Sequence, residues 1–435
     1  MIKKINYKYI VFSLIPTILF LILFEIACFS YFVKKLGFKN ALKQQTPFYN
    51  FAKTTENEQD KLAREKYFKI QREDYFVFDL NLGVRFRPYS NVISLEPNND
   101  GTPRIATDRK LKVNKYGFVS NYKSIESETN FDEIIKNDKI FKIIVSGGST
   151  VAGWGASLNI YTWPAQLERL LNSQKPDLLK DYDKIILINT GVLGYNISQE
   201  IKLFIEETIY LNPDLLILFN GINEKYEYKG NPIEYSSSTH QRRMLHFLNN
   251  QDKKLEATVI FPYITKVLIS LIFEKEKTKV KKYYGEYLYG YKNKDYIDLG
   301  APDLYYSKIL QFKGIAESHS VPFIYIFQPT MAFGKKNLTK WEEKVKKFFN
   351  SEFYNETWET YEARLNKFYE QVKPKLKEKC QFDFSNLFDN IEAEVYSDPR
   401  HYNDYGQKLI AQEIYKLILK NLYKRKKDNK IEICN

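Results

Sequence analysis

The chain has 435 residues and carries 66 Lys and Arg against 53 Asp and Glu, a formal net charge of +13. With 44% hydrophobic residues it can bury a core, and its length corresponds to about two or three structural units. Three cysteines (Cys28, Cys380, Cys434) are too few and too scattered for a disulfide framework. The sequence contains no Cys-x-x-Cys pair, so we expect no structural zinc site. The absence of a Gly-x-x-x-x-Gly-Lys-Ser/Thr motif excludes an ordinary P-loop nucleotide hydrolase. We expect neither a metal nor an organic cofactor.

The positive charge is spread along the chain rather than gathered in one segment. Lysines alternate with acids at residues 273–277, and the densest basic run, residues 424–427, is short. This pattern is typical of a solvated surface or of a surface that faces anionic lipid. We therefore expect no nucleic-acid partner.

Residues 9–33 are almost wholly apolar. As a helix, this stretch would rise about 37 Å, which is enough to cross a hydrocarbon core of about 30 Å with some tilt. It is too long for the apolar part of a secretory signal peptide, so residues 1–34 are predicted to form a retained N-terminal transmembrane anchor. Glu25 is costly at the bilayer centre, and we expect it either near one interface or in contact with a partner.

The lysines that flank this stretch do not decide its orientation, because similar numbers precede and follow it. Large soluble domains translocate largely regardless of charge, so an extracytoplasmic domain is compatible with the sequence. We expect a single-pass membrane protein whose large C-terminal domain is extracytoplasmic. Residues 35–138, with a turn-rich segment at 96–103, are predicted to be a membrane-proximal region of strands and loops packed on that domain.

From about residue 139, short apolar runs alternate with helical patterns. The predicted strands cover residues 140–145, 185–188, 215–219, 321–327 and 382–387. Helical spacing follows at residues 163–171 and 201–211, and again in the last helix around 409–418. This alternation predicts an α/β fold whose parallel sheet is covered on both faces, with a site beyond the carboxyl ends of the strands.

A long segment at about residues 225–302 separates the third predicted strand from the fourth. It is rich in Tyr and Lys and is too long for an ordinary connection. Its apolar stretch at residues 257–273, interrupted by Lys266, is too short and mixed for a second span. We expect a lid helix or a helix that lies on the membrane.

Four short fragments carry residues suited to catalysis. They are Gly147-Gly148-Ser149-Thr150, residues 189–194, Gly221-Ile222-Asn223-Glu224 and Asp398-Pro399-Arg400-His401. Each fragment alone is typical of a turn or a helix cap. The first three follow predicted strands and the fourth precedes the last helix, so their order and context are more informative than any single fragment.

Together and in order, these fragments resemble those of the SGNH (GDSL-type) hydrolase family, over residues 139–428. The resemblance implies a flavodoxin-like three-layer α/β/α sandwich with a parallel sheet. It places Ser149 on the nucleophile and Asp398 and His401 on the other triad positions. It places Ser149, Gly194 and Asn223 on the oxyanion hole. The chain departs from the family where Gly148 replaces an Asp and where Glu224 replaces the Asp that often follows the asparagine.

These residue types suit acyl transfer. A serine hydroxyl is a weak nucleophile that needs an adjacent base, and His401 can take its proton and return it to the leaving group. Asp398 can hold the other ring nitrogen and fix the tautomer. The backbone N–H groups of Ser149 and Gly194 and the Asn223 amide would stabilise the oxyanion. We expect Asn220, in contrast, to cap the turn after its strand.

The sequence therefore predicts a membrane-anchored serine esterase or O-acyltransferase. By analogy with anchored, polysaccharide-associated members of the family, the substrate is an acyl group, acetyl above all, on a cell-envelope or exported polysaccharide. Two alternatives stay open: a lipid-directed esterase that uses residues 257–273 as a lid, and a non-catalytic envelope protein that keeps the fold for binding or assembly. Protein partners are not identified.

Overall fold

The computed structural model describes one large unit and scattered helical residues between positions 16 and 34. The described ranges of the large unit are 75–79, 82–97, 103–124, 128, 130–224, 301–349, 358–424 and 431–434. Much of the expected anchor and nearly all of the insertion at 225–302 lie outside the described residues. Within the described residues, none of the helices combines the length and apolar composition that crossing a bilayer requires.

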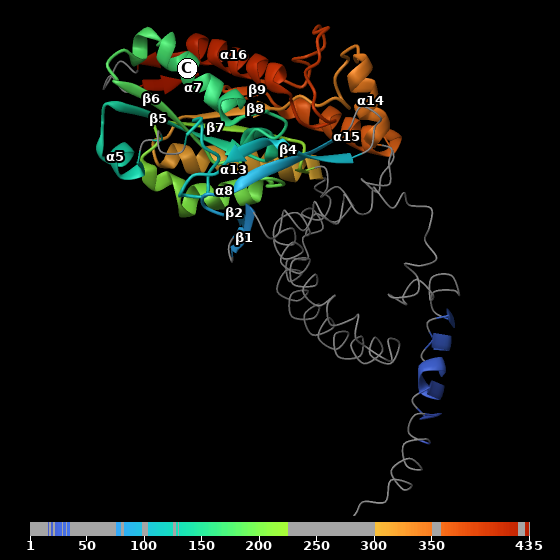
Figure 1. Cartoon of the computed structure of the whole chain (residues 1–435). Coiled ribbons are helices and arrows are strands. Elements are labelled where there is room, and N and C mark those ends of the chain that lie inside the picture. Colours follow the sequence, from blue (N-terminus) through green and yellow to red (C-terminus); the bar gives the residue numbers. More distant parts are fainter. Residues whose placement is uncertain are drawn as a thin grey trace, which may run out of the picture. The chain divides into compact units, whose positions relative to one another are not determined.

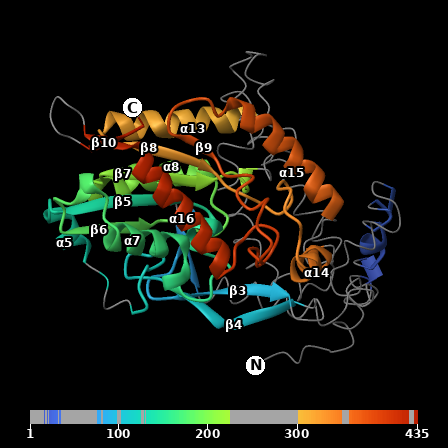
Figure 2. The same cartoon turned by 90° about the horizontal axis from the view of Figure 1, so that it is seen from above.

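A five-stranded parallel sheet forms the centre of the large unit, in the order β6-β5-β7-β8-β9 (Figure 2). The strands are β5 (Ile140–Gly147), β6 (Lys184–Asn189), β7 (Leu215–Asn220), β8 (Phe323–Phe327) and β9 (Gln381–Asp383). All residues of β5, β7 and β8 are buried, as expected of strands covered on both faces. The predicted parallel sheet is confirmed, although β9 ends before the predicted stretch 382–387 does.

Helices cover both faces of this sheet. In Figure 1 the sheet lies between α7 (Trp163–Ser173) with α16 (Asp404–Asn421) and α8 (Ile197–Glu206) with α13 (Ala301–Ser318). Within each layer the two helices are in contact, and α15 (Trp358–Val372) packs on α13. The arrangement is the three-layer α/β/α sandwich that the sequence predicted. The shorter helices are α5 (Phe131–Lys136), α6 (Ser149–Ala152) and α14 (Lys340–Phe349).

Side-chain caps start the helices that border the carboxyl edge of the sheet. Thr162 caps α7, Asn403 caps α16, and Asn196 forms a capping box with Gln199 at the start of α8. The helix predicted at residues 201–211 is really two pieces, since α8 ends at Glu206 and a 3₁₀ turn, Thr208–Leu211, follows it.

Besides helix α5, the described part of residues 35–138 contains two antiparallel hairpins. They pair β1 (Phe76–Asp79) with β2 (Gly83–Phe86), and β3 (Asn91–Pro97) with β4 (Pro103–Lys112). Arg85 on β2 forms a bidentate ion pair with Glu207 at 2.6 and 2.7 Å, and the Tyr195 hydroxyl donates to the carbonyl of Val84 at 2.6 Å. The first hairpin therefore packs on the segment that follows β6 and on the end of α8. The boundary at residue 138 stays a prediction.

A disulfide joins Cys380 to Cys434, with a Cα–Cα distance of 5.6 Å. It links the start of β9 to the end of a C-terminal hairpin, β10 (Leu422–Lys424) with β11 (Ile431–Ile433). The sequence analysis missed this bridge, because two cysteines 54 residues apart show no pairing pattern. Closing a loop of this length stabilises a fold by about 4 kcal/mol in the chain-entropy estimate.

Candidate active site

Ser149 follows strand β5 directly and is the first residue of α6. The preceding Gly148 has no room for a side chain, because a Cβ there would lie 2.5 Å from the amide nitrogen of Asn223. In this chain, a side chain at position 148 would need the space that the Asn223 amide occupies. The glycine thus lets the exits of β5 and β7 approach each other beside Ser149.

The structure brings Ser149, His401 and Asp398 together in a hydrogen-bonded chain. Ser149 Oγ lies 2.6 Å from His401 Nε2, and His401 Nδ1 lies 2.6 Å from Asp398 Oδ2. All three residues are more than 90% buried but not closed off, with 7–9% of their surface exposed. Ser149 and His401 come from segments 252 residues apart, so only the fold brings them within bonding distance.

Hydrogen bonds and charge position Asp398 to bind His401. Its second oxygen, Oδ1, accepts hydrogen bonds from the backbone N–H of Arg400 at 2.8 Å and of His401 at 3.0 Å. Burial raises the pKa of Asp398, but attraction to His401, hydrogen bonds to His401 and Arg400, and the Arg400 charge outweigh it, so the pKa is lowered overall. Asp398 is therefore ionised at neutral pH and can stabilise an imidazolium on His401.

Further residues hold the loop that carries Asp398 and His401. The Trp154 ring packs on His401, with ring centroids 5.8 Å apart. Gly155 touches the same loop so closely that a Cβ would collide with the side chain of Ser397. Glu342 on α14 accepts the backbone N–H groups of Val395 at 3.0 Å and of the next residue at 3.2 Å.

Glu342 is itself held by a buried ion pair with Lys336, at 2.7 Å and with side-chain exposures of 0% and 2%. Removing one partner of such a pair leaves a buried charge uncompensated, which makes the pair a strong constraint on the loop. The sequence analysis missed this pair, since a Lys and a Glu six residues apart in a polar segment carry no signal of burial.

The predicted oxyanion-hole residues lie at the same edge of the sheet. Asn223, beyond β7, donates its side-chain amide to the carbonyl of Tyr195 at 2.7 Å. Gly194, in the turn after β6, precedes Tyr195 directly and has a left-handed backbone with φ of 73°. Asn223 therefore lies between the Gly194 turn and the backbone just before Ser149. This places all five predicted site residues at the carboxyl edge of the sheet.

Asn220 does not cap the turn after β7, which corrects the expectation from the sequence. Its amide nitrogen donates to Glu200 at 2.5 Å, and its oxygen accepts from the Tyr305 hydroxyl at 2.5 Å. Tyr305 lies on α13, a helix that the sequence analysis did not predict, so Asn220 could not be assigned its buried partners. Asn220 and Asn223 thus point into different surroundings, as expected.

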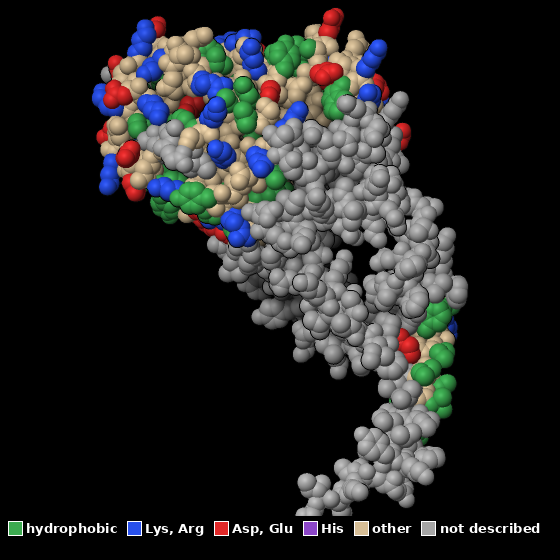
Figure 3. Space-filling view, in the orientation of Figure 1, with side chains coloured by type: hydrophobic (Ala, Val, Ile, Leu, Met, Phe, Trp, Pro, Cys, Tyr) green, Lys and Arg blue, Asp and Glu red, His purple; other side chains and the backbone are tan. Residues whose placement is uncertain are grey.

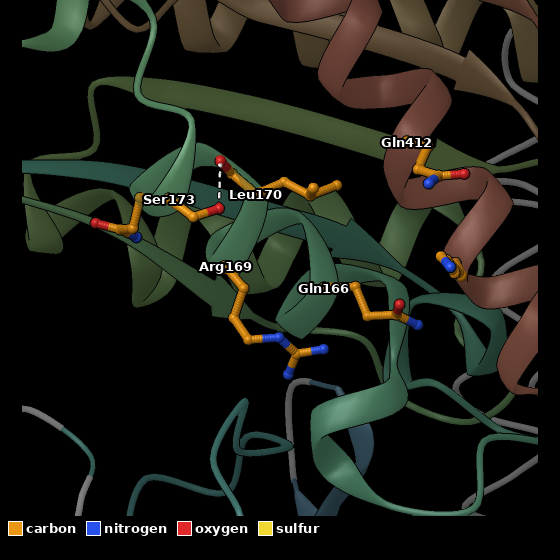
Figure 4. A pocket seen from close by; sticks show the side chains of 7 residues that line it. Gln166, Arg169, Leu170, Ser173 and Gln412 are labelled. Atoms are coloured by element: carbon orange, nitrogen blue, oxygen red, sulfur yellow. Dashed lines mark hydrogen bonds between the residues drawn. The ribbon is translucent and has the colours of Figure 1, made fainter.

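A hollow on the large unit lies apart from Ser149, His401 and Asp398. It has a volume of about 660 Å³ and lies between α7 and α16, where Gln166, Arg169 and Gln412 line it (Figure 4). None of the five predicted site residues lines this hollow. Figure 3 shows Lys and Arg intermixed with Asp and Glu on the face of the large unit seen there. Among the described residues no cluster of metal-ligating side chains occurs.

No family model and no curated protein matches the sequence. Among solved structures, the chain is similar to an acetyl xylan esterase, AlAXEase, at 13% identity, with 63% of this chain and 98% of the other covered and a TM-score of 0.31. It is similar to a lipase/acylhydrolase from Enterococcus faecalis at 10% identity (64% and 96% covered, TM-score 0.31). A GDSL-like lipase from Bacteroides thetaiotaomicron matches at 13% identity (64% and 88% covered, TM-score 0.27). Likeness at this level carries no argument about activity.

Proposed function

We propose that the protein is a serine esterase or O-acyltransferase. One observation carries the proposal: the chain of two 2.6 Å contacts that runs from Ser149 Oγ through His401 to Asp398. This is the arrangement that activates a serine hydroxyl as a nucleophile. A fold kept for binding alone would not need all three groups in bonding contact.

The proposed reaction has two halves. Ser149 Oγ attacks the acyl carbonyl while His401 Nε2 takes the hydroxyl proton, and Asp398 stabilises the imidazolium. The oxyanion receives hydrogen bonds from the N–H groups of Ser149 and Gly194 and from Asn223. His401 then protonates the leaving alcohol oxygen. In the second half, water or a sugar hydroxyl loses a proton to His401 and attacks the acyl-enzyme, giving hydrolysis or transfer.

We propose O-acyl groups, acetyl above all, on a cell-envelope or exported polysaccharide as the substrate. Two exposed tyrosines support a carbohydrate. Tyr161 and Tyr405 are 39% and 43% exposed, and Gln166 donates to the carbonyl of Tyr161 at 2.6 Å and to that of Asp404 at 3.5 Å. The two tyrosines therefore come from adjoining backbone, beside the loop of His401. A tyrosine face is flat and apolar with a polar tip, which suits the face and rim of a sugar ring.

The proposed location is the extracytoplasmic side of a membrane, with residues 1–34 as the anchor. The apolar pattern of residues 9–33 supports the anchor. The bridge between Cys380 and Cys434 supports the location, because disulfides persist in oxidising compartments and are rare in the cytosol.

Hydrolysis of p-nitrophenyl acetate by the purified protein tests the esterase proposal. We expect turnover that Ser149→Ala abolishes without changing the thermal melting temperature. Turnover that survives in Ser149→Ala would contradict the proposed nucleophile. Much faster turnover of long-chain esters would instead favour the lipid-directed alternative, whose expected lid at residues 257–273 lies outside the described residues.

A further inference from the structure

Two carboxylic side chains are buried directly behind the candidate oxyanion hole. Glu200 lies on the first turns of α8 and is 1% exposed, and Glu224 follows Asn223 and is 0% exposed. In the described part of the chain, no lysine or arginine forms an ion pair with Glu200. A buried acid without a cation is costly to keep ionised, so the presence of Glu200 beside the site requires an explanation.

Glu224 braces the segment that carries Gly194. Its Oε1 accepts the backbone N–H of Ile197, the first residue of α8, at 2.9 Å. The preceding Asn223 donates to the carbonyl of Tyr195 at 2.7 Å. Two consecutive residues beyond β7 therefore hold residues 194–197 from two sides. The longer Glu, where the family often has Asp, is what reaches Ile197.

The surroundings of Glu200 favour its neutral form. Its Oε2 accepts from Asn220 at 2.5 Å, while Oε1 has no hydrogen-bond donor in the described part of the chain. Burial raises the pKa of Glu200 well above its ordinary value, the negative charge of Glu224 raises it further, and the hydrogen bond from Asn220 lowers it in part. Glu224 binds the backbone of the helical turn that carries Glu200, and ionisation of one of two neighbouring buried carboxyl groups disfavours ionisation of the other.

In the described part of the chain, the tyrosine hydroxyls near Glu200 supply no compensating positive charge. Beyond Asn220 lies the Tyr305 hydroxyl, which is 2.8 Å from the Tyr325 hydroxyl. Burial, together with the charges of nearby acids, keeps the pKa of Tyr325 well above its ordinary value, so this tyrosine is neutral. Among the described residues, Glu224 is the one whose charge raises the pKa of Glu200.

We propose that Glu200 and Glu224 form a buried carboxylic acid–carboxylate pair, in which the Glu200 acid donates to Glu224, and that this pair positions residues 194–197 as the oxyanion-hole segment. The inference rests on the proposed ester chemistry, for which both acids are positioning residues that do not touch the reacting atoms. When Glu200 loses its proton, the two carboxylates repel each other. Glu224 is then pushed from Ile197, and the oxyanion donors lose their alignment.

Kinetics of the full-length protein test the positioning role. Glu224→Asp, shorter by one methylene, should lower kcat about 10- to 100-fold with KM within about twofold, because oxyanion donors act in the transition state. Glu200→Ala should lower kcat, and Glu200→Gln, which keeps a neutral donor, should restore most of the loss. The native protein should lose kcat at alkaline pH, and Glu200→Gln should lack that loss. Glu206→Gln, at an exposed position of α8, is the control.

Infrared spectroscopy tests the shared proton without any turnover. The difference spectrum of the native protein minus Glu200→Gln should show the C=O stretch of a protonated carboxyl at pH 7. The band should disappear as pH rises, and at a lower pH in Glu224→Gln, where the repulsion is removed. Absence of the band at pH 7, or an alkaline loss of kcat unchanged in Glu200→Gln, would overturn the proposal. Presence of the band in a protein that hydrolyses no ester would contradict the proposed function and leave the pair intact.

Discussion

Gly148 and Asn223 lie so close that a Cβ on Gly148 would be 2.5 Å from the Asn223 amide nitrogen. The same amide donates to the carbonyl of Tyr195, so displacing it would strain or break that hydrogen bond. The glycine before Ser149 is therefore what allows the Asn223 amide to lie where it does.

Gly148→Ala is predicted to lower kcat by about 10²-fold, because the added methyl group displaces the Asn223 amide from the developing oxyanion. Melting temperature and steady-state kinetics would be measured together. Gly314→Ala is the control, since a Cβ at this position on α13 meets nothing within 4 Å. The control should be fully active and slightly more stable, as expected for Ala in place of a helical Gly. A Gly148→Ala variant with unchanged kcat would show that catalysis does not depend on the position of the Asn223 amide.

Asn223→Ala should lower the rate of turnover, whereas Asn220→Ala should lower the stability of the fold. Loss of the Asn223 amide should lower kcat about 10²- to 10³-fold with little change in KM or melting temperature. Asn220→Ala removes one buried hydrogen bond from Glu200 and one from Tyr305, which should cost about 1–3 kcal/mol in the free energy of unfolding. Measuring kcat per folded molecule, together with chemical denaturation, separates the loss of turnover from the loss of stability. The assignment is wrong if Asn220→Ala is the variant that folds but does not turn over.

Tyr161→Ala and Tyr405→Ala should weaken binding of a polymer but not of a small ester. We expect KM for an O-acetylated polysaccharide to rise about tenfold, and KM for p-nitrophenyl acetate to change by less than about twofold, because stacked faces lie outside the acyl site. Tyr210→Ala, at a 69% exposed position after α8, serves as the control. Equal effects on KM for both substrates would argue against sugar binding by Tyr161 and Tyr405.

Cys380→Ser should lower the free energy of unfolding by about 4 kcal/mol, because the unfolded chain regains the freedom that the bridge removes. The C-terminal hairpin lies at Leu422–Lys424 and Ile431–Ile433, away from the triad in the sequence, so turnover per folded molecule should be unchanged. Cys434→Ser should lower the free energy of unfolding by the same amount, and the double variant should lower it no further. Unequal losses, or free thiols in the native protein, would remove the support for an oxidising location.

The sheet and its site edge could be predicted because their signals are local. Apolar runs such as 140–145 and 215–219 mark strands buried on both faces, and their parallel order follows from the helices between them. The resemblance then supplied Ser149, Asp398 and His401, which the structure places in contact.

The features that the sequence analysis did not predict depend on contacts between distant segments, which leave no local pattern. Helix α13 begins at the end of an insertion whose composition obscured it. Asn220 appeared to be a turn residue until Glu200 and Tyr305 came beside it in the fold. The Cys380–Cys434 bridge likewise joins segments 54 residues apart.

Site-specific labelling with a fluorophosphonate tests the central claim most directly, because only an activated serine reacts with it. Peptide mass spectrometry of the labelled, folded protein should find the adduct on Ser149. The adduct should be lost in His401→Ala and strongly reduced in Asp398→Asn, since the base and its orientation are then missing. A folded protein that takes no label, or takes it on another serine, would contradict the assignment of Ser149, His401 and Asp398 as a catalytic triad.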